Sequence, residues 1–155
     1  MKSKVLEYGG YVIHLGTMGI YIALIAIRQF TEGLRSFPYP GWILLVLGII
    51  LVILSVVTLR REKTSKIITH GVFSLVRHPM YLGFMLLFLS MVCFIPHWVI
   101  IVLCPINLLV LYYFMVEGDQ MNLEKFGEKY RRYMRTVPQV NILVGLVNWW
   151  KNRRS

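Results

Sequence analysis

The sequence predicts an all-α integral membrane protein with four transmembrane helices, a C-terminal helical hairpin and an amphipathic cytoplasmic tail helix. Of its 155 residues, 57% are hydrophobic and only 15% are charged, and the mean hydropathy is +0.62. A soluble domain has about a quarter charged residues. Four apolar stretches contain no Asp, Glu, Lys or Arg. The length therefore suits a single membrane-embedded domain, residues 1–155, of four spans of about 20 residues each.

The expected spans cover residues 11–27, 42–59, 80–95 and 98–116, followed by a tail of residues 117–155. At about 1.5 Å per residue each span is roughly 24–28 Å long, close to the ~30 Å hydrocarbon core. These stretches must be helical, because lipid cannot hydrogen-bond an open backbone. The first is followed by Arg28 and not by a small-residue cleavage site, so we interpret it as a retained span. Only Pro96 and His97 separate the last two, which predicts an antiparallel hairpin.

The basic residues predict the orientation. If both termini lie on one side, that side carries all 17 Lys and Arg except Arg28 and Arg35. The positive-inside rule then places both termini in the cytoplasm. The net charge of +10 is thus explained by loops beside anionic lipid and not by nucleic-acid binding. The compact size suits a prokaryotic plasma membrane.

The tail is expected to contain one amphipathic helix from Asp119 to Met134. Its apolar residues recur every three or four positions, which makes one helical face: Leu123, Phe126, Tyr130 and Tyr133. Such a helix lies on the membrane surface, and Val137-Pro138 should end it. Residues 142–150 are apolar but too short to span, so they are expected to be interfacial or to pack back onto the bundle.

Metal and redox chemistry are not indicated. Cys93 and Cys104 lie in apolar runs, without CxxC spacing or a neighbouring His or Cys, which favours buried thiols and no metal site. His14 lies within the first span, where polar residues are functional candidates. A histidine hydrogen-bonded to a neighbouring helix is the favoured interpretation, since no partner motif is visible.

Two segments hold more polar residues than span ends require, namely residues 71–83 and 117–119. Pro79 suits the first turn of a helix, and a helix start beside Arg77 and His78 favours an anion. Because the hairpin returns to the same side, Glu117 and Asp119 should come close to these two residues. The cluster is either an interfacial ion pair that closes the hairpin or a binding site for a carboxylate or phosphate.

These segments also resemble a family. Arg77-His78-Pro79-Met80-Tyr81-Leu82-Gly83 resembles the RHPxYxG motif of the isoprenylcysteine carboxyl methyltransferase and phospholipid methyltransferase superfamily of membrane enzymes. Residues 126–138 are similar to the FGxxYxxYxxxVP signature of the same enzymes. The two motifs occur in order on either side of the hairpin, and together they cover close to half of the chain.

The resemblance implies methyl transfer from S-adenosylmethionine to a lipophilic or small hydrophobic acceptor that enters from the bilayer. It implies cofactor binding by Arg77, His78, Pro79, Tyr81, Leu82, Gly83, Glu117, Phe126 and Tyr130, and catalytic roles for Glu117, Asp119 and Arg77. In this scheme Arg77, His78 and the amides of the helix start meet the cofactor carboxylate, and Glu117 meets its ammonium. Gly83 would let a group approach the backbone closely. No GxGxxG occurs, so a Rossmann site is not expected.

The sequence also departs from the family. The prenylcysteine enzymes carry an arginine shortly before the acidic cluster, whereas residues 111–116 contain no basic residue here. Arg77, Arg131 or Arg132 would have to replace it, which argues against carboxyl methylation in particular. Gln139 follows Val137-Pro138 where the family often has a basic or aromatic residue.

Two other functions stay open. Sterol and steroid reductases share a similar motif pair but use NADPH and generally have more spans. A non-enzymatic membrane module would use the basic face to hold anionic lipid. Carboxylate, amine and thiol acceptors are all compatible with the sequence, as is any oligomeric state.

Overall fold

The structure is a computed structural model that describes residues 12–20, 22–23, 37–62 and 66–154. These residues form helices and connecting loops without a β-strand. In chain order the elements are α2 (Pro38–Arg61), the short 3-10 helix η1 (Gly71–Ser74), α3 (Pro79–Phe94), α4 (Trp98–Phe126), α5 (Glu128–Thr136) and α6 (Ile142–Arg154). Residues 12–20 and 22–23 are also helical. The predicted all-α class is confirmed for the described residues.

Two helices are long and apolar enough to cross a membrane, α2 with 24 residues and α4 with 29. They coincide with the second and fourth predicted spans. The third predicted span is α3, which is apolar but has only 16 residues. The first predicted span covers residues 11–27, and its positions 11, 21 and 24–27 lie outside the described residues. Membrane association is thus indicated by two helices, and four crossings stay a prediction.

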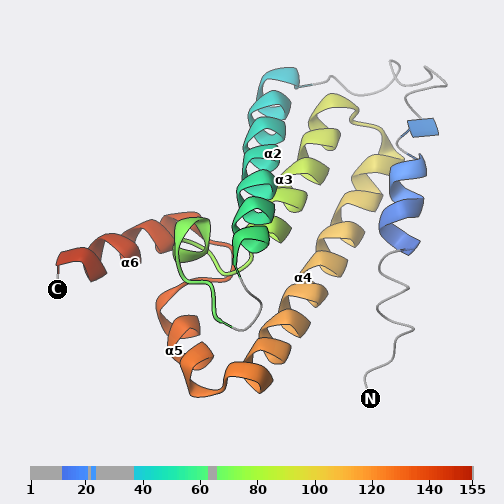
Figure 1. Cartoon of the computed structure of the whole chain (residues 1–155). Helices are drawn as coiled ribbons and strands as arrows, with labels where there is room; N and C mark the ends of the chain where they lie inside the picture. Colours follow the sequence, from blue (N-terminus) through green and yellow to red (C-terminus); the bar gives the residue numbers. More distant parts are fainter. Residues whose placement is uncertain (1–11, 21, 24–36, 63–65, 155) are drawn as a thin grey trace.

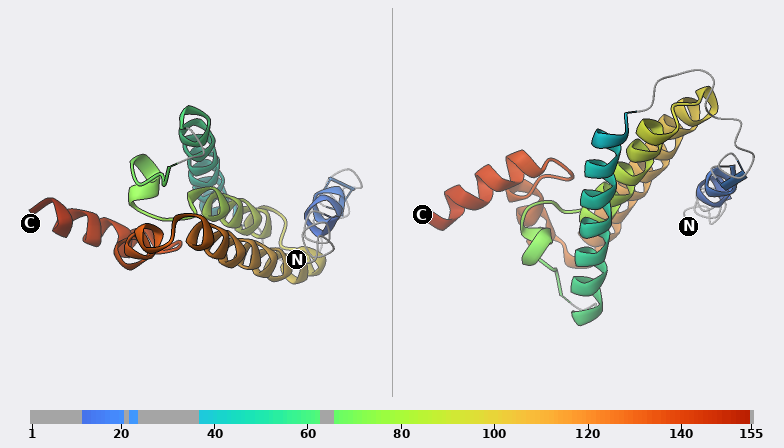
Figure 2. Two further views of the ribbon diagram at one scale, coloured as in Figure 1. Left: turned by 60° about the horizontal axis from the view of Figure 1, so that its bottom comes forward. Right: turned by 90° about the horizontal axis from the view of Figure 1, so that it is seen from above.

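Helix α3 lies between α2 and α4, and all three run side by side (Figures 1 and 2). Glycines let α2 and α3 approach closely: a Cβ added at Gly83 would lie 2.7 Å from Val52 Cγ2 and 2.8 Å from the Gly48 carbonyl oxygen. Small residues at such positions are typical of helix contacts in membranes. The close approach expected at Gly83 is therefore made by α2, and no space for a cofactor is left against this backbone.

The predicted hairpin is present. Helix α3 ends at Phe94, and α4 begins at Trp98, where His97 Nδ1 accepts a hydrogen bond from the Val99 amide at 3.3 Å. The two helices bury an apolar core made of Phe88, Ile100, Cys104 and Leu111. Cys104 is buried, as the sequence predicted, whereas Cys93 is only half-buried.

The tail differs from the prediction. Helix α4 continues without a break to Phe126, and Gly127 with φ of +55° separates it from α5. The single helix expected over residues 119–134 is therefore wrong, because a residue in the left-handed region ends one helix and redirects the chain into the next. Val137 ends α5 as expected. Helix α6 then leaves the bundle sideways (Figure 1).

His14 has the partner expected of a histidine that is bonded to a neighbouring helix. Its Nδ1 donates to Asn107 Oδ1 on α4 at 2.6 Å, and Asn107 Nδ2 donates to Thr17 Oγ1 at 3.1 Å. The Asn107 side chain is fully buried. This polar cluster ties the first helical segment to α4.

Candidate functional site

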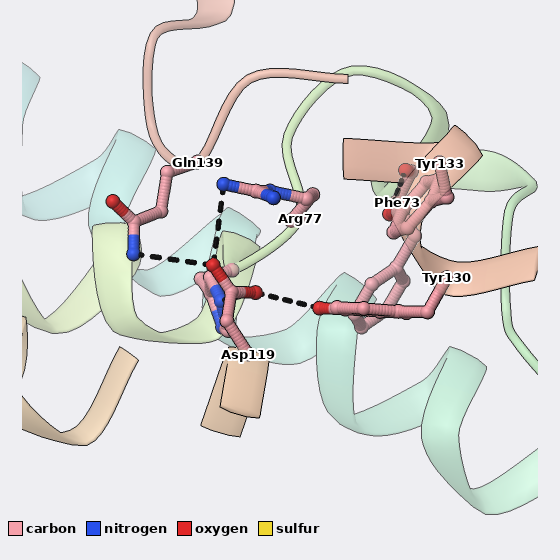
Figure 3. Close-up of polar contacts among 7 residues, drawn as sticks. Phe73, Arg77, Asp119, Tyr130, Tyr133 and Gln139 are labelled. Carbon is pink, nitrogen blue, oxygen red and sulfur yellow. Dashed lines mark hydrogen bonds and ion pairs between the residues drawn. The ribbon is translucent and has the colours of Figure 1, made fainter. Parts of the chain in front are cut away.

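Asp119 is the centre of a buried polar network (Figure 3). Its side chain lies on α4 and the residue is only 7% exposed. His78 Nε2 lies 2.8 Å from Oδ1, and the Tyr130 hydroxyl donates to the same oxygen at 2.6 Å. Arg77 Nη2 lies 3.2 Å from Oδ2, and Gln139 Nε2 donates to Oδ2 at 3.5 Å. Both predicted motifs and the segment after α5 thus meet at one carboxylate.

Backbone hydrogen bonds hold the two motifs together. The Arg77 amide donates to the Pro138 carbonyl at 2.9 Å, and the His78 amide donates to the Gln139 carbonyl at 3.2 Å. This explains how a segment sixty residues away is fixed beside the start of α3. The Arg77 and His78 amides, which precede α3, are therefore occupied by the chain itself and cannot bind a cofactor carboxylate.

A tyrosine pair fixes α5 against the rest of the site. The Tyr133 hydroxyl donates to the Phe73 carbonyl in η1 at 2.6 Å, while Tyr130 reaches Asp119 (Figure 3). Burial raises the pKa of both phenols, and the Asp119 carboxylate raises the pKa of Tyr130 further. Both therefore stay protonated at neutral pH and act as hydrogen-bond donors.

Asp119 is an ionised anchor. The apolar stretch of α4 ends at Val116, so Asp119 lies beyond the predicted span. Burial favours the protonated form, but the hydrogen bonds from His78 and Tyr130 and the charges of His78 and Arg77 outweigh it and hold the pKa of Asp119 below its ordinary value. A carboxylate with a lowered pKa and four partners is a weak base. Its contacts fix where the Arg77 and His78 side chains lie.

Arg77 has hydrogen-bonding capacity to spare. Its side chain is 10% exposed. Only Nη2 contacts Asp119, and Nε and Nη1 are buried without a hydrogen-bond partner among the described residues. Leaving buried charged donors unsatisfied costs about 1–3 kcal/mol or more each. A bound anion could accept hydrogen bonds from these donors and so remove this cost.

Arg77 lines a cavity of about 250 Å³ between the end of α2, the loop before α3, the end of α4 and α5. Three cations face it, Lys66, Arg77 and Lys125, and Glu62 is the one carboxylate among the described lining residues. Asn122 adds a polar group. The apolar and aromatic part of the wall is formed by Leu59, Ile67, Ile68, Phe73, Phe126, Tyr130 and Tyr133.

The predicted site residues fall into two groups. Arg77, Phe126 and Tyr130 line the cavity, and His78 and Asp119 support them. Pro79, Tyr81, Leu82, Gly83 and Glu117 are outside its lining.

The residues outside the lining have other surroundings. Pro79 is buried at the start of α3, and the Tyr81 ring packs edge-on against His78. Glu117 is half-buried and forms no ion pair or hydrogen bond with any residue that the structure describes. A Cβ added at Gly118 would lie 3.5 Å from His78 Cε1, so the turn of α4 between the two acids faces His78.

Sequence reasoning missed several lining residues. Asn122 and Phe126 share a helical face with Asp119, since they follow it by three and seven positions on α4. The helix predicted over residues 119–134 already contained Asn122, and the face that it shares with Asp119 could have identified it. Lys66 and Glu62 come from the end of α2 and the loop after it, and no sequence pattern links them to α5. Of the three arginines considered as replacements, Arg77 alone lines this cavity.

Comparisons with known proteins identify the family. A search of curated proteins and a search of solved structures each returned no match. A family model described as phospholipid methyltransferase matches residues 37–128, which is more than half of the 155 residues. The match contains α2, α3 and α4, with Arg77, His78 and Asp119 inside it. The chain therefore belongs to the phospholipid methyltransferase family.

Proposed function

We propose that the protein transfers a methyl group from S-adenosylmethionine to a lipophilic or small hydrophobic acceptor at the cytoplasmic face of the membrane. Family membership indicates a membrane methyltransferase, and methyltransferases of this family generally use this cofactor. The single observation that carries the proposal concerns Arg77, which lines the cavity and whose buried Nε and Nη1 have no partner among the described residues.

The lining residues fit the chemistry of the cofactor. The free donors of Arg77 suit its carboxylate, because hydrogen bonds between ionised groups are the strong ones. Glu62 suits its ammonium and would take the role expected of Glu117. Phe73, Phe126 and Tyr130 supply aromatic surface for the adenine. His78 and Asp119 do not face the cavity and hold Arg77 and Tyr130 in place.

The residues of this chain would act by orientation and by excluding water. When bound, the cofactor supplies a methyl group on a sulfonium, which is already a good leaving group. In-line displacement then depends on how the acceptor is positioned and on a dry site. Leu59, Ile67 and Ile68 give the cavity an apolar wall that suits a lipophilic acceptor. A carboxylate or thiolate acceptor needs little base assistance, and a neutral amine can attack first and lose its proton later.

Isothermal titration of the detergent-purified protein tests this proposal. We expect S-adenosylhomocysteine to bind and NADPH not to bind. Arg77→Lys keeps a charge beside Asp119 but loses donors, so S-adenosylhomocysteine affinity should fall about tenfold or more. Arg131→Lys is the matched control, because Arg131 is exposed and pairs with Glu128 at 3.5 Å. Binding of NADPH without S-adenosylhomocysteine would overturn the proposal in favour of a reductase.

A further inference from the structure

A second cavity lies on the other side of η1 and α5 from the Arg77 cavity, and Tyr133 lines both. This groove has a volume of about 610 Å³ and runs between η1, α5 and α6. Its polar wall is formed by Thr69, His70, Ser74, Lys129, Arg132 and Thr136. Nothing in the proposed methyl transfer uses it.

The groove is positively charged. Lys129 and Arg132 are exposed on α5, and neither forms an ion pair with any carboxylate in the part of the chain that the structure describes. No Asp or Glu is among its described lining residues. Arg131, the neighbour on the same helix, is paired with Glu128 instead. Two unpaired cations beside hydroxyl groups suit a phosphate.

The groove continues into an apolar space. A neighbouring cavity of about 370 Å³ shares Gly71, Ser74 and Trp149 with it and adds Leu75 and Leu146. A polar, cationic part that opens into an apolar part is the pattern expected for an amphiphilic ligand and not for a free ion.

Helix α6 supplies most of the apolar part and touches the rest of the protein at only a few points. A Cβ added at Gly145 would collide with the Leu75 carbonyl oxygen, so the two backbones are in contact there. Asn148 Nδ2 donates to the Thr136 carbonyl at 3.0 Å. The helix leaves the bundle sideways in two views (Figures 1 and 2) and exposes Leu143 to 76%. Exposed apolar residues and tryptophans next to basic residues are typical of helices in the membrane interface.

We infer that the groove between η1, α5 and α6 binds the head group of an anionic phospholipid of the cytoplasmic leaflet. Lys129 and Arg132 contact the phosphate, and the acyl chains lie along Leu75, Leu146 and Trp149. The lipid holds α5 from the side opposite to the Arg77 cavity. The groove shares Tyr133 with the Arg77 cavity, and its His70 lies 3.3 Å from Glu62 of that cavity. Lipid binding in the groove does not depend on the proposed methyl transfer.

The test uses the full chain in detergent, titrated with short-chain phosphatidylglycerol, short-chain phosphatidylcholine or inorganic phosphate, with binding measured by calorimetry. We expect phosphatidylglycerol to bind and the other two to bind at least tenfold more weakly. Lys129→Gln/Arg132→Gln should weaken phosphatidylglycerol binding roughly tenfold to thirtyfold, from about 1 kcal/mol for each basic residue.

The matched control is Arg131→Gln/Arg135→Gln, which removes the same charge from exposed positions on the same helix. It should retain the affinity of the unmodified protein. Equal losses in both double variants would refute the site, because general attraction would then explain the binding. Inorganic phosphate binding as tightly as the lipid, or phosphatidylcholine doing so, would also refute it. Circular dichroism checks the fold of each variant, and S-adenosylhomocysteine titration of the same samples separates this result from the methyl-donor proposal.

Discussion

Replacing Tyr130 with Phe tests whether Asp119 works as an ionised anchor. Tyr130 is buried, and its hydroxyl donates to Asp119 Oδ1 at 2.6 Å. The variant removes this hydroxyl and leaves the ring, whose centroid lies 5.7 Å from that of Tyr133. A hydrogen bond to a charged group contributes about 1.5–3 kcal/mol. We expect the free energy of unfolding at pH 7 to fall by about that amount.

The effect should depend on pH with a definite sign. The pKa of Asp119 lies below its ordinary value, so its stabilising contribution is present above the unfolded pKa of about 3.9 and is lost as the pH falls through the folded pKa. The Tyr130 hydrogen bond is one cause of this lowering. The difference between Tyr130→Phe and the unmodified protein should therefore be large at pH 7 and shrink on acidification below about pH 4.

Tyr133→Phe is the matched control. It removes a hydroxyl of the same helix that donates to a neutral acceptor, the Phe73 carbonyl, at 2.6 Å. We expect a loss of about 0.5–1.5 kcal/mol that does not shrink in acid. Thermal unfolding in one detergent, followed by circular dichroism at pH 7 and at pH 3, measures both variants. Equal losses that are independent of pH in both would show that Asp119 is not the charged centre described above.

Three further substitutions and one control test the packing of the helices and of the site. Gly83→Ala should destabilise the protein by about 1–3 kcal/mol, because the added methyl group overpacks against Val52. Gly118→Ala is the control and should be tolerated, because its added methyl group would make only ordinary contacts. Chemical unfolding measures both variants, and equal stabilities would contradict the close contact between α2 and α3. Gly127→Ala places a side chain at φ of +55° and ψ of −130°, so we expect about 1–3 kcal/mol of strain and weaker S-adenosylhomocysteine binding. Unchanged affinity in a titration would argue against α5 as part of the site. Asn107→Leu should lower the free energy that holds residues 12–20 against α4 by about 0.6–1.7 kcal/mol. Amide hydrogen exchange in these residues should then become faster. Unchanged exchange would show that the His14 cluster does not hold this segment.

Much of the fold could be predicted because the signals are local. Charge-free runs predicted the positions of α2, α3 and α4, and two residues between runs predicted the hairpin. The full length of α4 could not be predicted in this way, because its last ten residues contain Glu117, Asp119, Glu124 and Lys125 and lie beyond the charge-free run. The break depends on the positive φ of Gly127, and a glycine in a sequence does not reveal which φ it adopts.

The site, like the fold, could be predicted only where the sequence signal is local. The sequence predicted that Glu117 and Asp119 both lie near Arg77 and His78. Two residues that are two positions apart on a helix point in directions about 160° apart. Only one of them can face His78, and the structure selects Asp119 over Glu117. Likewise, a glycine in a sequence can indicate that another group lies close to its backbone, but not which group. At Gly83 that group is helix α2. Lys66 and Glu62 reach the cavity through a loop, where no periodicity predicts the direction of a side chain.

The most direct test of the central claim is the transfer of label from methyl-labelled S-adenosylmethionine to lipid. The purified protein is reconstituted with a membrane lipid extract, and label in the organic phase is measured over time. We expect labelled product with the unmodified protein and with Arg131→Lys, and a rate at least about tenfold lower with Arg77→Lys. No labelled product from correctly folded protein, or equal rates for both arginine variants, would contradict it.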